Sequence, residues 1–374
     1  MVNKGEGRSG QQPRHLVHVF PSFARGGSQT RFGQLAAAHG GRYRHTVLAL
    51  DGNLEMAGHI PPSVALECPV PSFDKSAGLL NLALFRRTLK ELKPDLLITY
   101  NWGAMEWCLA NRWRPLAPHI HIEDGFGPEE KQRQLLRRVM FRRLALSGPH
   151  TRVVLPSRQL ENIALHEWRL PARSVLYVPN GVDCARFAGA ASARQEHTTI
   201  TIGTVATLRT EKNLGRLIRA FAAVATERPA DTLKLVIVGD GPERKALETQ
   251  AQATGMGARI LFAGPTATPE NALAEMDIFA LSSDTEQMPL SVLEAMAAEL
   301  PVASPAVGDV ADMVADENRP YVTPPGDEAG FRRTLGLLAD DPSLRKRLGI
   351  ANRVAALSRF DHNRMIARYA DIFG

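Results

Sequence analysis

The stretch 277–308 contains two carboxylates that could take part in chemistry. Glu286 lies in an expected loop, and Glu294 follows on the first or second turn of an expected helix, so both side chains can point into one cleft at different depths. The amides of Leu290 and Ser291 at the start of that helix are unsatisfied donors that suit a phosphate. A pair of glutamates at this spacing is also typical of an ordinary helix surface. The stretch alone leaves both interpretations open.

Two cations occupy a similar place earlier in the chain. Arg209 and Lys212 follow an expected strand and precede a helix that begins near Leu214. Ligands of parallel α/β sheets bind at the carboxyl ends of the strands, so cations there suit a diphosphate. The alternative is a pair of solvated loop charges.

Two glycine turns could let the backbone approach an anion. Gly26 and Gly27 lie between an expected strand and a helix, and Gly241 lies in the turn of Val238–Pro242. Glycines at such turns allow amides to approach a phosphate at a helix N-terminus. Any tight strand-to-helix turn can also carry them, and for Gly241 plain turn chemistry is the stronger interpretation.

The elements that must position these residues alternate along the whole chain. Short apolar runs separated by helical patterns are typical of a mostly parallel sheet covered by helices, which predicts the α/β class in both halves. The expected strands are 16–20, 46–50, 96–99, 120–122, 153–155, 175–178, 199–205, 233–238, 260–262, 278–281 and 302–304. Residues 189–197 are small and polar without an apolar period, and we expect the linker there.

Composition excludes several classes of protein. The 374 residues predict two domains, and 44% hydrophobic with 22% charged residues is typical of globular proteins. The three cysteines are scattered without a metal-binding or disulfide spacing, which favours a reducing, cytoplasmic setting without a metal site. No stretch suggests export or a membrane span. Residues 1–183 hold 24 Lys and Arg against 15 Asp and Glu, but no nucleic-acid-binding motif accompanies that charge, and we expect no nucleic acid partner.

In their order along the chain these motifs resemble the family 4 retaining glycosyltransferases of the GT-B fold. The resemblance covers nearly the whole sequence. It rests on the following segments: Gly26-Gly27, Val178–Asp183, Arg209 with 211–213, Val238–Pro242, and Glu286 with Glu294 followed by Ala295–Ala297. It implies two Rossmann-like domains with a cleft between them: an acceptor domain of 1–188, a nucleotide-sugar domain of 189–359, and a helix in 360–374 that packs back on the first domain.

The resemblance also implies roles for individual residues. Arg209 and Lys212 would bind the donor diphosphate, Glu286 would hold the sugar and Glu294 would bind the ribose. The implied catalytic set is Glu286, Arg209, Lys212 and Asp124, and the implied donor-binding set is Gly26, Gly27, Gly241, Met288, Leu290, Ser291 and Glu294. No metal or other cofactor is expected, because the nucleotide-sugar is a substrate.

The sequence departs from the family pattern at two places. The family usually has Gly-Phe-Gly after the first glutamate, whereas this chain has Gln287-Met288-Pro289, and Pro289 cannot donate an amide hydrogen bond. The sugar is therefore left open. The family tends to place a His followed by Gly after an N-domain strand near the reacting carbon. Here Asp124, Glu123 or His121 is expected at that position, and the sequence does not choose among them.

The expected activity is sugar transfer from a nucleotide-sugar to a saccharide or lipid-linked acceptor with retention, as in cell-surface polysaccharide or glycolipid synthesis. Alternatives are a non-catalytic nucleotide-sugar-binding protein and a sugar-nucleotide epimerase. A helix expected at 129–146 combines apolar residues with basic ones, Lys131 among them, which suggests contact with the inner face of a membrane. A helix that packs its apolar stripe on the sheet and exposes its basic face is the competing interpretation.

Overall fold

The structure is a computed structural model that describes residues 12–70, 80–130, 133–193, 199–229 and 232–374. The chain folds as two compact units. The first contains the described residues up to Leu155, together with Asn162–Leu176 and Tyr369–Gly374, and the second contains Pro156–Glu161 and Tyr177–Arg368. Within the described parts, no helix is both long enough and apolar enough to cross a membrane.

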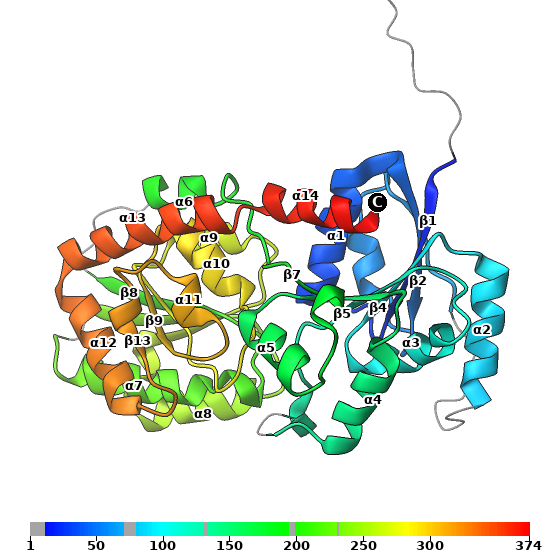
Figure 1. Ribbon diagram of the computed structural model, residues 1–374. Coiled ribbons are helices and arrows are strands. Elements are labelled where there is room, and N and C mark those ends of the chain that lie inside the picture. Colours follow the sequence, from blue (N-terminus) through cyan, green and yellow to red (C-terminus); the bar gives the residue numbers. More distant parts are fainter. Residues whose placement is uncertain (1–11, 71–79, 131–132, 194–198, 230–231) are drawn as a thin grey trace, which may run out of the picture. The chain divides into compact units, whose positions relative to one another are not determined.

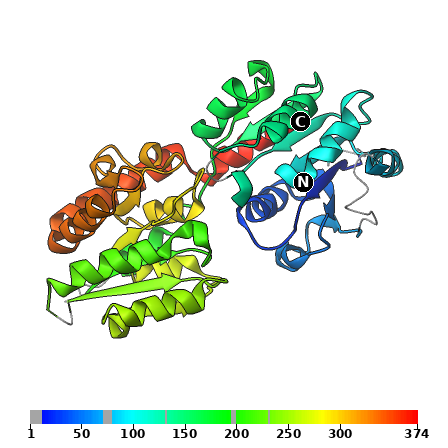
Figure 2. The ribbon, with the colours of Figure 1, turned by 90° about the horizontal axis from the view of Figure 1, so that it is seen from below.

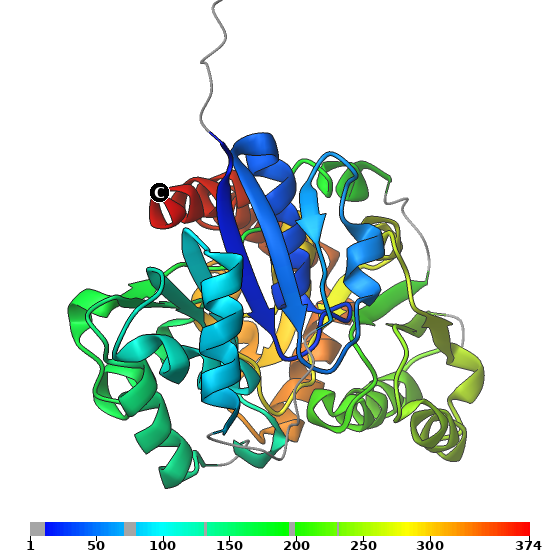
Figure 3. The ribbon, with the colours of Figure 1, turned by 90° about the vertical axis from the view of Figure 1, so that its right-hand side faces the viewer.

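The first unit is built on a parallel sheet of seven strands in the order β3-β2-β1-β4-β5-β6-β7. Its strands are β1 (Arg14–Phe20), β2 (Tyr43–Ala49), β3 (Ala65–Glu67), β4 (Leu96–Tyr100), β5 (His119–Ile122), β6 (Thr151–Leu155) and β7 (Val175–Tyr177). Its helices are α1 (Gly27–His39), α2 (Leu80–Leu92), α3 (Met105–Arg112), α4 (Leu136–Leu146) and α5 (Arg158–His166), whose first residues belong to the second unit. Figure 3 shows β1 and β2 side by side.

Successive side chains of β1 pack against helices on opposite faces of this sheet. Val17 and Val19 pack in one buried cluster with Phe85 of α2 and Trp107 of α3. His18, one residue along, faces Phe32 of α1, with ring centroids 4.7 Å apart. Because successive side chains of a strand point to opposite faces, both faces of the sheet are buried under helices.

The second unit is built on a six-stranded sheet in the order β10-β9-β8-β11-β12-β13. Its strands are β8 (Ile200–Val205), β9 (Leu233–Val238), β10 (Ile260–Gly264), β11 (Ile278–Ala280), β12 (Val302–Pro305) and β13 (Val322–Thr323). Its helices are α6 (Ala188–Ala193), α7 (Leu214–Thr226), α8 (Arg244–Ala253), α9 (Pro269–Ala274), α10 (Leu290–Ala297), α11 (Val310–Met313), α12 (Glu328–Asp340), α13 (Pro342–Arg359) and the larger part of α14 (His362–Phe373). Figures 1 and 2 show α7 and α8 side by side.

Strand β11 shows how this unit is packed. Ile278 and Ala280 belong to the buried cluster that includes α7, while Phe279 and Leu281 belong to the cluster that includes α10. The side chains on both faces of the strand are therefore excluded from water, as a continuous apolar run predicts. The expected α/β class with two parallel, helix-covered sheets is confirmed.

Two expected boundaries differ from the structure. Residues 189–193 of the expected linker lie in α6 (Ala188–Ala193), because the alanine-rich sequence has a high helix propensity, and 194–197 lie outside the described residues. The expected helix at 129–146 begins only at Leu136; Pro128–Glu130 form a 3-10 turn. Leu135 precedes the helix in extended conformation, with its amide donating to the Glu130 carboxylate at 3.2 Å, and Lys131 lies outside the described residues.

The second unit begins earlier than the expected boundary at 188/189. Tyr177–Ala188 belong to it because hydrogen bonds tie this segment to later parts of the chain. The Val182 amide donates to the Phe360 carbonyl at 2.8 Å, and the His362 amide donates to the Val182 carbonyl at 3.0 Å. The chain returns to the first unit with Tyr369–Gly374, the last part of α14.

Candidate functional site

Two loops of the second unit meet at the carboxyl ends of neighbouring strands. Strands β8 and β11 pair in parallel, with Ile202 opposite Ile278, so the loops that follow them emerge at one edge of the sheet. There the Lys212 ammonium contacts the Glu286 carboxylate, with Nζ and Oε1 2.6 Å apart. The two side chains are 24% and 11% exposed, so the pair lies at the surface without being fully solvated. The sheet thus unites two of the residues singled out from the sequence.

Neighbouring hydroxyl groups fix this pair in place. Ser283 donates to the same Glu286 oxygen at 2.7 Å, and Ser282 donates to the Lys212 carbonyl at 2.9 Å. Both serines are buried. Glu286 therefore has a defined orientation, and the backbone that carries Lys212 is bonded directly to the loop that carries Glu286.

Arg216 is a further residue that joins the two loops, and the sequence analysis did not single it out. Its guanidinium donates to the Ser282 carbonyl at 3.0 Å and to the Asp284 carboxylate at 2.8 Å. Asn213 also donates to Asp284, at 2.9 Å, while its own side-chain oxygen accepts the Arg216 amide and caps α7. An asparagine that caps a helix, followed by an arginine in the first helical turn, is the sequence pattern from which these contacts of Arg216 could have been predicted.

Arg209 lies three residues before Lys212 and points to solvent. Its side chain is exposed, and in the described part of the chain it forms no ion pair. The Lys212 amide donates to its carbonyl at 3.0 Å in the short 3-10 turn Thr210–Lys212. This turn keeps the two cations on one loop, although only Lys212 has a carboxylate partner.

Helix α10 begins four residues after Glu286. Pro289 is its N-cap, and the Pro289 carbonyl accepts the amide of Val292 at 3.2 Å. Leu290 and Ser291 are the first two helical residues, whose amides have no carbonyl within the helix to bond. The N-terminus of α10, which is the positive end of its helix dipole, therefore follows Glu286 closely in the sequence.

Met288 and Gln287, at the departure from the family pattern, are held by the second unit itself. Met288 is 5% exposed, and its carbonyl accepts the side-chain amide of Asn180 at 3.0 Å. The Gln287 carbonyl accepts the amide of Asp309 at 2.9 Å, and its side-chain oxygen accepts the Ser157 hydroxyl at 3.0 Å. These contacts give both residues a structural role, and the expected donor contact of Met288 stays a prediction.

Glu294 lies on the second turn of α10 and is partly buried. Burial raises the pKa of its carboxyl to about 7; Glu270 adds to that rise and Arg186 opposes it. Arg186 itself is bound to Glu270, with nitrogen and oxygen 2.6 Å apart. Near neutral pH Glu294 can therefore exchange a proton, unlike an ordinary surface carboxylate.

Gly241 is required by the backbone around it. A Cβ atom at this position would lie 2.5 Å from the Leu208 carbonyl oxygen, and the neighbouring Gly239 has a φ of +137°. The Leu208 amide donates to the Asp240 carbonyl at 2.9 Å. The glycine turn after β9 therefore packs directly on the loop after β8, and a donor contact of Gly241 stays a prediction.

In the first unit, Gly26 and Gly27 form the start of helix α1 directly after the loop that follows β1. Gly26 is the N-cap with an extended backbone (φ −172°), and Gly27 is the first helical residue. The Gln29 side chain donates to the Ser22 carbonyl at 2.8 Å across the turn. The helix N-terminus expected from the sequence is present.

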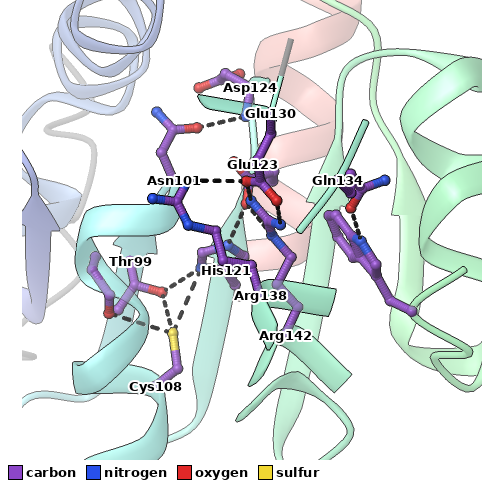
Figure 4. A network of polar contacts seen from close by, with 12 residues as sticks. Thr99, Asn101, Cys108, His121, Glu123, Asp124, Glu130, Gln134, Arg138 and Arg142 are labelled. Carbon is purple, nitrogen blue, oxygen red and sulfur yellow. Dashed lines mark hydrogen bonds and ion pairs between the residues drawn. The ribbon is translucent and has the colours of Figure 1, made fainter. Parts of the chain in front are cut away.

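The three candidates at the end of β5 have different surroundings (Figure 4). Asp124 is partly exposed and forms a two-point ion pair with the buried Arg31, with nitrogen–oxygen distances of 2.7 and 2.8 Å. Burial lowers the pKa of Arg31, but Asp124 outweighs it, and the net shift is upward. Glu123 and His121 are fully buried. Asp124 is thus the candidate of the three that reaches the surface.

His121 takes part in an interior network. Its ring contacts Thr99 at 2.9 Å and Cys108 at 3.6 Å, and its Nε2 lies 3.5 Å from Glu123 (Figure 4). Burial by itself lowers the pKa of His121. Cys108 and Glu123 raise that pKa by a larger amount, so the net pKa is about 9. Within the described residues, no group of three or more His, Cys, Asp or Glu side chains is arranged to hold a metal ion.

Comparison with protein families decides the family. Residues 190–354 match the family described as glycosyl transferases group 1, and residues 26–181 match the glycosyl transferase 4-like domain. The chain belongs to the family 4 glycosyltransferases. Together the two matches cover the second sheet, the strands β2 to β7 of the first sheet, and all the candidate residues of this chain.

Individual curated relatives match only part of this chain. The N-acetyl-alpha-D-glucosaminyl L-malate synthase of Bacillus anthracis is 28% identical over 169 residues, which are 45% of this chain and 44% of that protein. A GDP-mannose-dependent alpha-mannosyltransferase of Mycolicibacterium smegmatis is 34% identical over 222 residues, 56% of this chain and 53% of the relative. The chain spans about half the length of these curated relatives.

A solved structure matches over nearly the full length. The Anabaena protein HepE, crystallised with UDP and glucose, covers 96% of this chain and 99% of its own, with a TM-score of 0.79 and 19% identity. This likeness shows the GT-B fold for this chain.

Proposed function

We propose that this protein transfers a sugar from a nucleotide-sugar donor to a saccharide or lipid-linked acceptor, with retention of anomeric configuration, in the synthesis of a cell-surface polysaccharide or glycolipid. The observation that carries the proposal is the Lys212–Glu286 pair at the shared edge of β8 and β11, followed by the N-terminus of α10. HepE has been crystallised with UDP-glucose, and the mycobacterial relative uses GDP-mannose. These relatives support a nucleoside diphosphate sugar as donor.

The donor diphosphate is assigned to the cations and the helix terminus. Lys212, Arg209 and the amides of Leu290 and Ser291 are the groups that stabilise a leaving diphosphate as the anomeric bond breaks. They supply positive charge without a metal, and we therefore propose that transfer continues when metal is chelated. The Lys212 ammonium exchanges part of its contact with Glu286 for the phosphate oxygens.

The two glutamates are assigned to the two ends of the donor. Glu286 lies on the loop beside Lys212 and accepts hydrogen bonds from sugar hydroxyls, while Glu294 accepts them from the ribose. Each carboxyl group can accept hydrogen bonds from two hydroxyls, so each contact helps to orient the donor.

In the first unit we assign the acceptor hydroxyl to Asp124. The Arg31 guanidinium occupies one lone pair on each carboxylate oxygen of Asp124, which leaves the second lone pairs free to accept an acceptor hydroxyl. The ion pair holds the Asp124 carboxylate in one orientation, as a positioned hydrogen-bond acceptor or base requires. Gly26 and Gly27 keep the expected role of approaching an anion at the start of α1.

A comparison of two variants tests the assignment. Glu286→Gln should depress transfer while nearly preserving affinity for the free nucleoside diphosphate, because the lost contact is to the sugar and counts mainly in the transition state. Glu294→Gln should weaken the free nucleotide as well. Calorimetric titration with UDP and GDP, beside transfer kinetics with a panel of labelled UDP- and GDP-sugars, supplies both quantities.

The outcome also separates the alternative functions. Parental transfer by Glu286→Gln contradicts the site. A donor that binds without turnover in any acceptor mixture favours a non-catalytic binding protein, and conversion of the donor sugar without an acceptor favours an epimerase.

A further inference from the structure

Helix α4 of the first unit presents large apolar side chains to solvent. Leu136 and Met140 are 70% and 71% exposed, and Leu144 is 44% exposed. They are spaced four residues apart, so they form one stripe along the helix. A helix that packs on a sheet ordinarily turns such a stripe inward. The apolar stripe of α4 is therefore not accounted for by the packing of the fold.

The inward side of α4 buries Arg142 beside the apolar Ala145 and Leu146. Arg142 is fully buried, and its guanidinium donates to the Glu130 carboxylate at 2.8 and 3.0 Å (Figure 4). It also lies over the rings of Phe126 and Trp168, about 5 Å from each centroid. Arg138 pairs with Glu129 and Glu130. The inward arginines have their charges compensated within the unit, which leaves the outer face free for another partner.

Two more arginines frame the apolar stripe. At about 100° per residue, Arg143 lies about 20° beyond Leu136 on one side and Arg137 about 20° beyond Leu144 on the other. Both are exposed, and neither takes part in an ion pair in the described part of the chain. The sequence of α4, Leu136–Leu146, contains no acidic residue. We call Leu136, Arg137, Met140, Arg143 and Leu144 the α4 outer face.

An exposed aromatic residue lies close to this helix. Trp113 is 66% exposed and directly follows α3, which packs on α4. The neighbouring Arg112 donates to the Ser147 hydroxyl at 3.4 Å, at the C-terminal end of α4. Tryptophan with exposed Leu, Met and Arg is the composition of a surface that enters the headgroup region of a bilayer.

We propose that the α4 outer face docks this protein on an anionic lipid surface. Apolar area supplies insertion and the framing arginines supply attraction to negatively charged headgroups, and no acidic residue of α4 opposes that attraction. The inference goes beyond the proposed transfer reaction. It involves none of the residues assigned to donor or acceptor, so each proposal can fail without the other.

Vesicle co-sedimentation tests the proposal. The protein should bind vesicles of phosphatidylglycerol and phosphatidylcholine at low salt, bind more weakly at high salt, and ignore pure phosphatidylcholine. Arg137→Gln and Arg143→Gln should each lower the partition coefficient about fivefold. Leu136→Ser and Met140→Ser should each lower it about tenfold, since each removes apolar area that enters the headgroups.

Matched controls make the result specific. Val354 on α13 is 60% exposed, so Val354→Ser removes a similar exposed apolar group and should leave the partition unchanged. All variants should keep the parental affinity for nucleoside diphosphate, which shows that they are folded. Absence of binding to the anionic vesicles, or equal losses in the control, overturns the proposal. Concentration-dependent self-association that disappears in Met140→Ser also overturns it, because the face would then be occupied by a second copy of this chain.

Discussion

The ion pair between Lys212 and Glu286 couples the two ends of the proposed donor site. Each side chain neutralises the other in the structure, and Ser283 donates to the same carboxylate oxygen that Lys212 contacts. A diphosphate that takes over Lys212 would release Glu286 to meet the sugar. Loss of Lys212 therefore removes both the proposed diphosphate contact and an ion-pair partner of Glu286.

Loss of either cation should weaken nucleotide binding. We expect Lys212→Ala and Arg209→Ala each to lose about 1.5–3 kcal/mol of binding free energy for UDP or GDP, whichever binds, because the lost contacts are charge-assisted and present in the ground state. Arg219→Ala is the control, since Arg219 lies on α7 but pairs with Glu328 at 2.7 Å. Calorimetry on the three variants checks this, and a loss no larger than the control's refutes the assignment.

The raised pKa of Glu294 makes stability depend on pH. Its pKa is about 7 in the folded protein, so the folded state retains a proton that the unfolded state releases above the ordinary value of about 4.5. The free energy of unfolding should therefore fall as pH rises through this window. Glu294→Gln, which cannot ionise, should be more stable than the parent at pH 8 by about 1–3 kcal/mol and should lose that advantage by pH 4. Urea unfolding of both proteins at the two pH values checks this. A difference in the free energy of unfolding that is the same at pH 4 and pH 8 contradicts the prediction.

At the scale of elements, the segment after β7 is fitted tightly against the start of α14. A Cβ atom on Gly181 would lie 2.6 Å from the Cα of His362, a backbone atom that no side-chain rotation can move away. The neighbouring Val182 forms backbone hydrogen bonds with Phe360 and His362, around the start of α14. The close packing of this segment against the start of α14 therefore requires glycine at position 181.

Gly181→Ala should destabilise the protein by about 1–3 kcal/mol, the usual cost of overpacking. Gly189→Ala is the matched control, because nothing lies within 4 Å of its added Cβ and alanine favours helix α6. Thermal unfolding of both variants provides the measurement. Equal midpoints in the two variants would show that the close approach at Gly181 is unimportant.

At the scale of the whole molecule, the chain leaves the first unit and returns to it with its last residues. Tyr369 is 1% exposed within the first unit, and the Arg31 guanidinium lies 5.9 Å from its ring centroid. Arg14 of β1 donates to the Phe373 carbonyl at 2.6 Å. Residues 369–374 thus complete the core of a unit whose other residues precede 177.

Tyr369→Ala should cost about 3–5 kcal/mol, as other losses of a buried ring do. Because Tyr369 is packed in the first unit, hydrogen exchange should accelerate in β1 and β2 more than in β8 and β9. Arg368→Ala, which changes the exposed preceding residue, should leave both sheets protected. Acceleration confined to the second unit would contradict the packing described here.

The sequence by itself determined the α/β class, most of the strands and the residues of the loops after β1, β8 and β11. These signals are local: a buried strand is a continuous apolar run, and a phosphate-binding turn contains glycine or a cation before a helix. It missed β3 and β13, edge strands of three and two residues, which are too short to show a period.

Only the tertiary structure decided which of these residues meet. Lys212 and Glu286 are 74 positions apart and are joined because β8 and β11 pair. Arg31 and Asp124 are 93 positions apart, and their ion pair distinguishes Asp124 from Glu123 and His121. Helix α4 is a further example. Its composition shows apolar and basic residues together, and only the burial of Arg142 against Glu130 shows that the apolar stripe faces outward. Pairing between strands and the direction of a helix face depend on contacts distant in sequence, which no local pattern encodes.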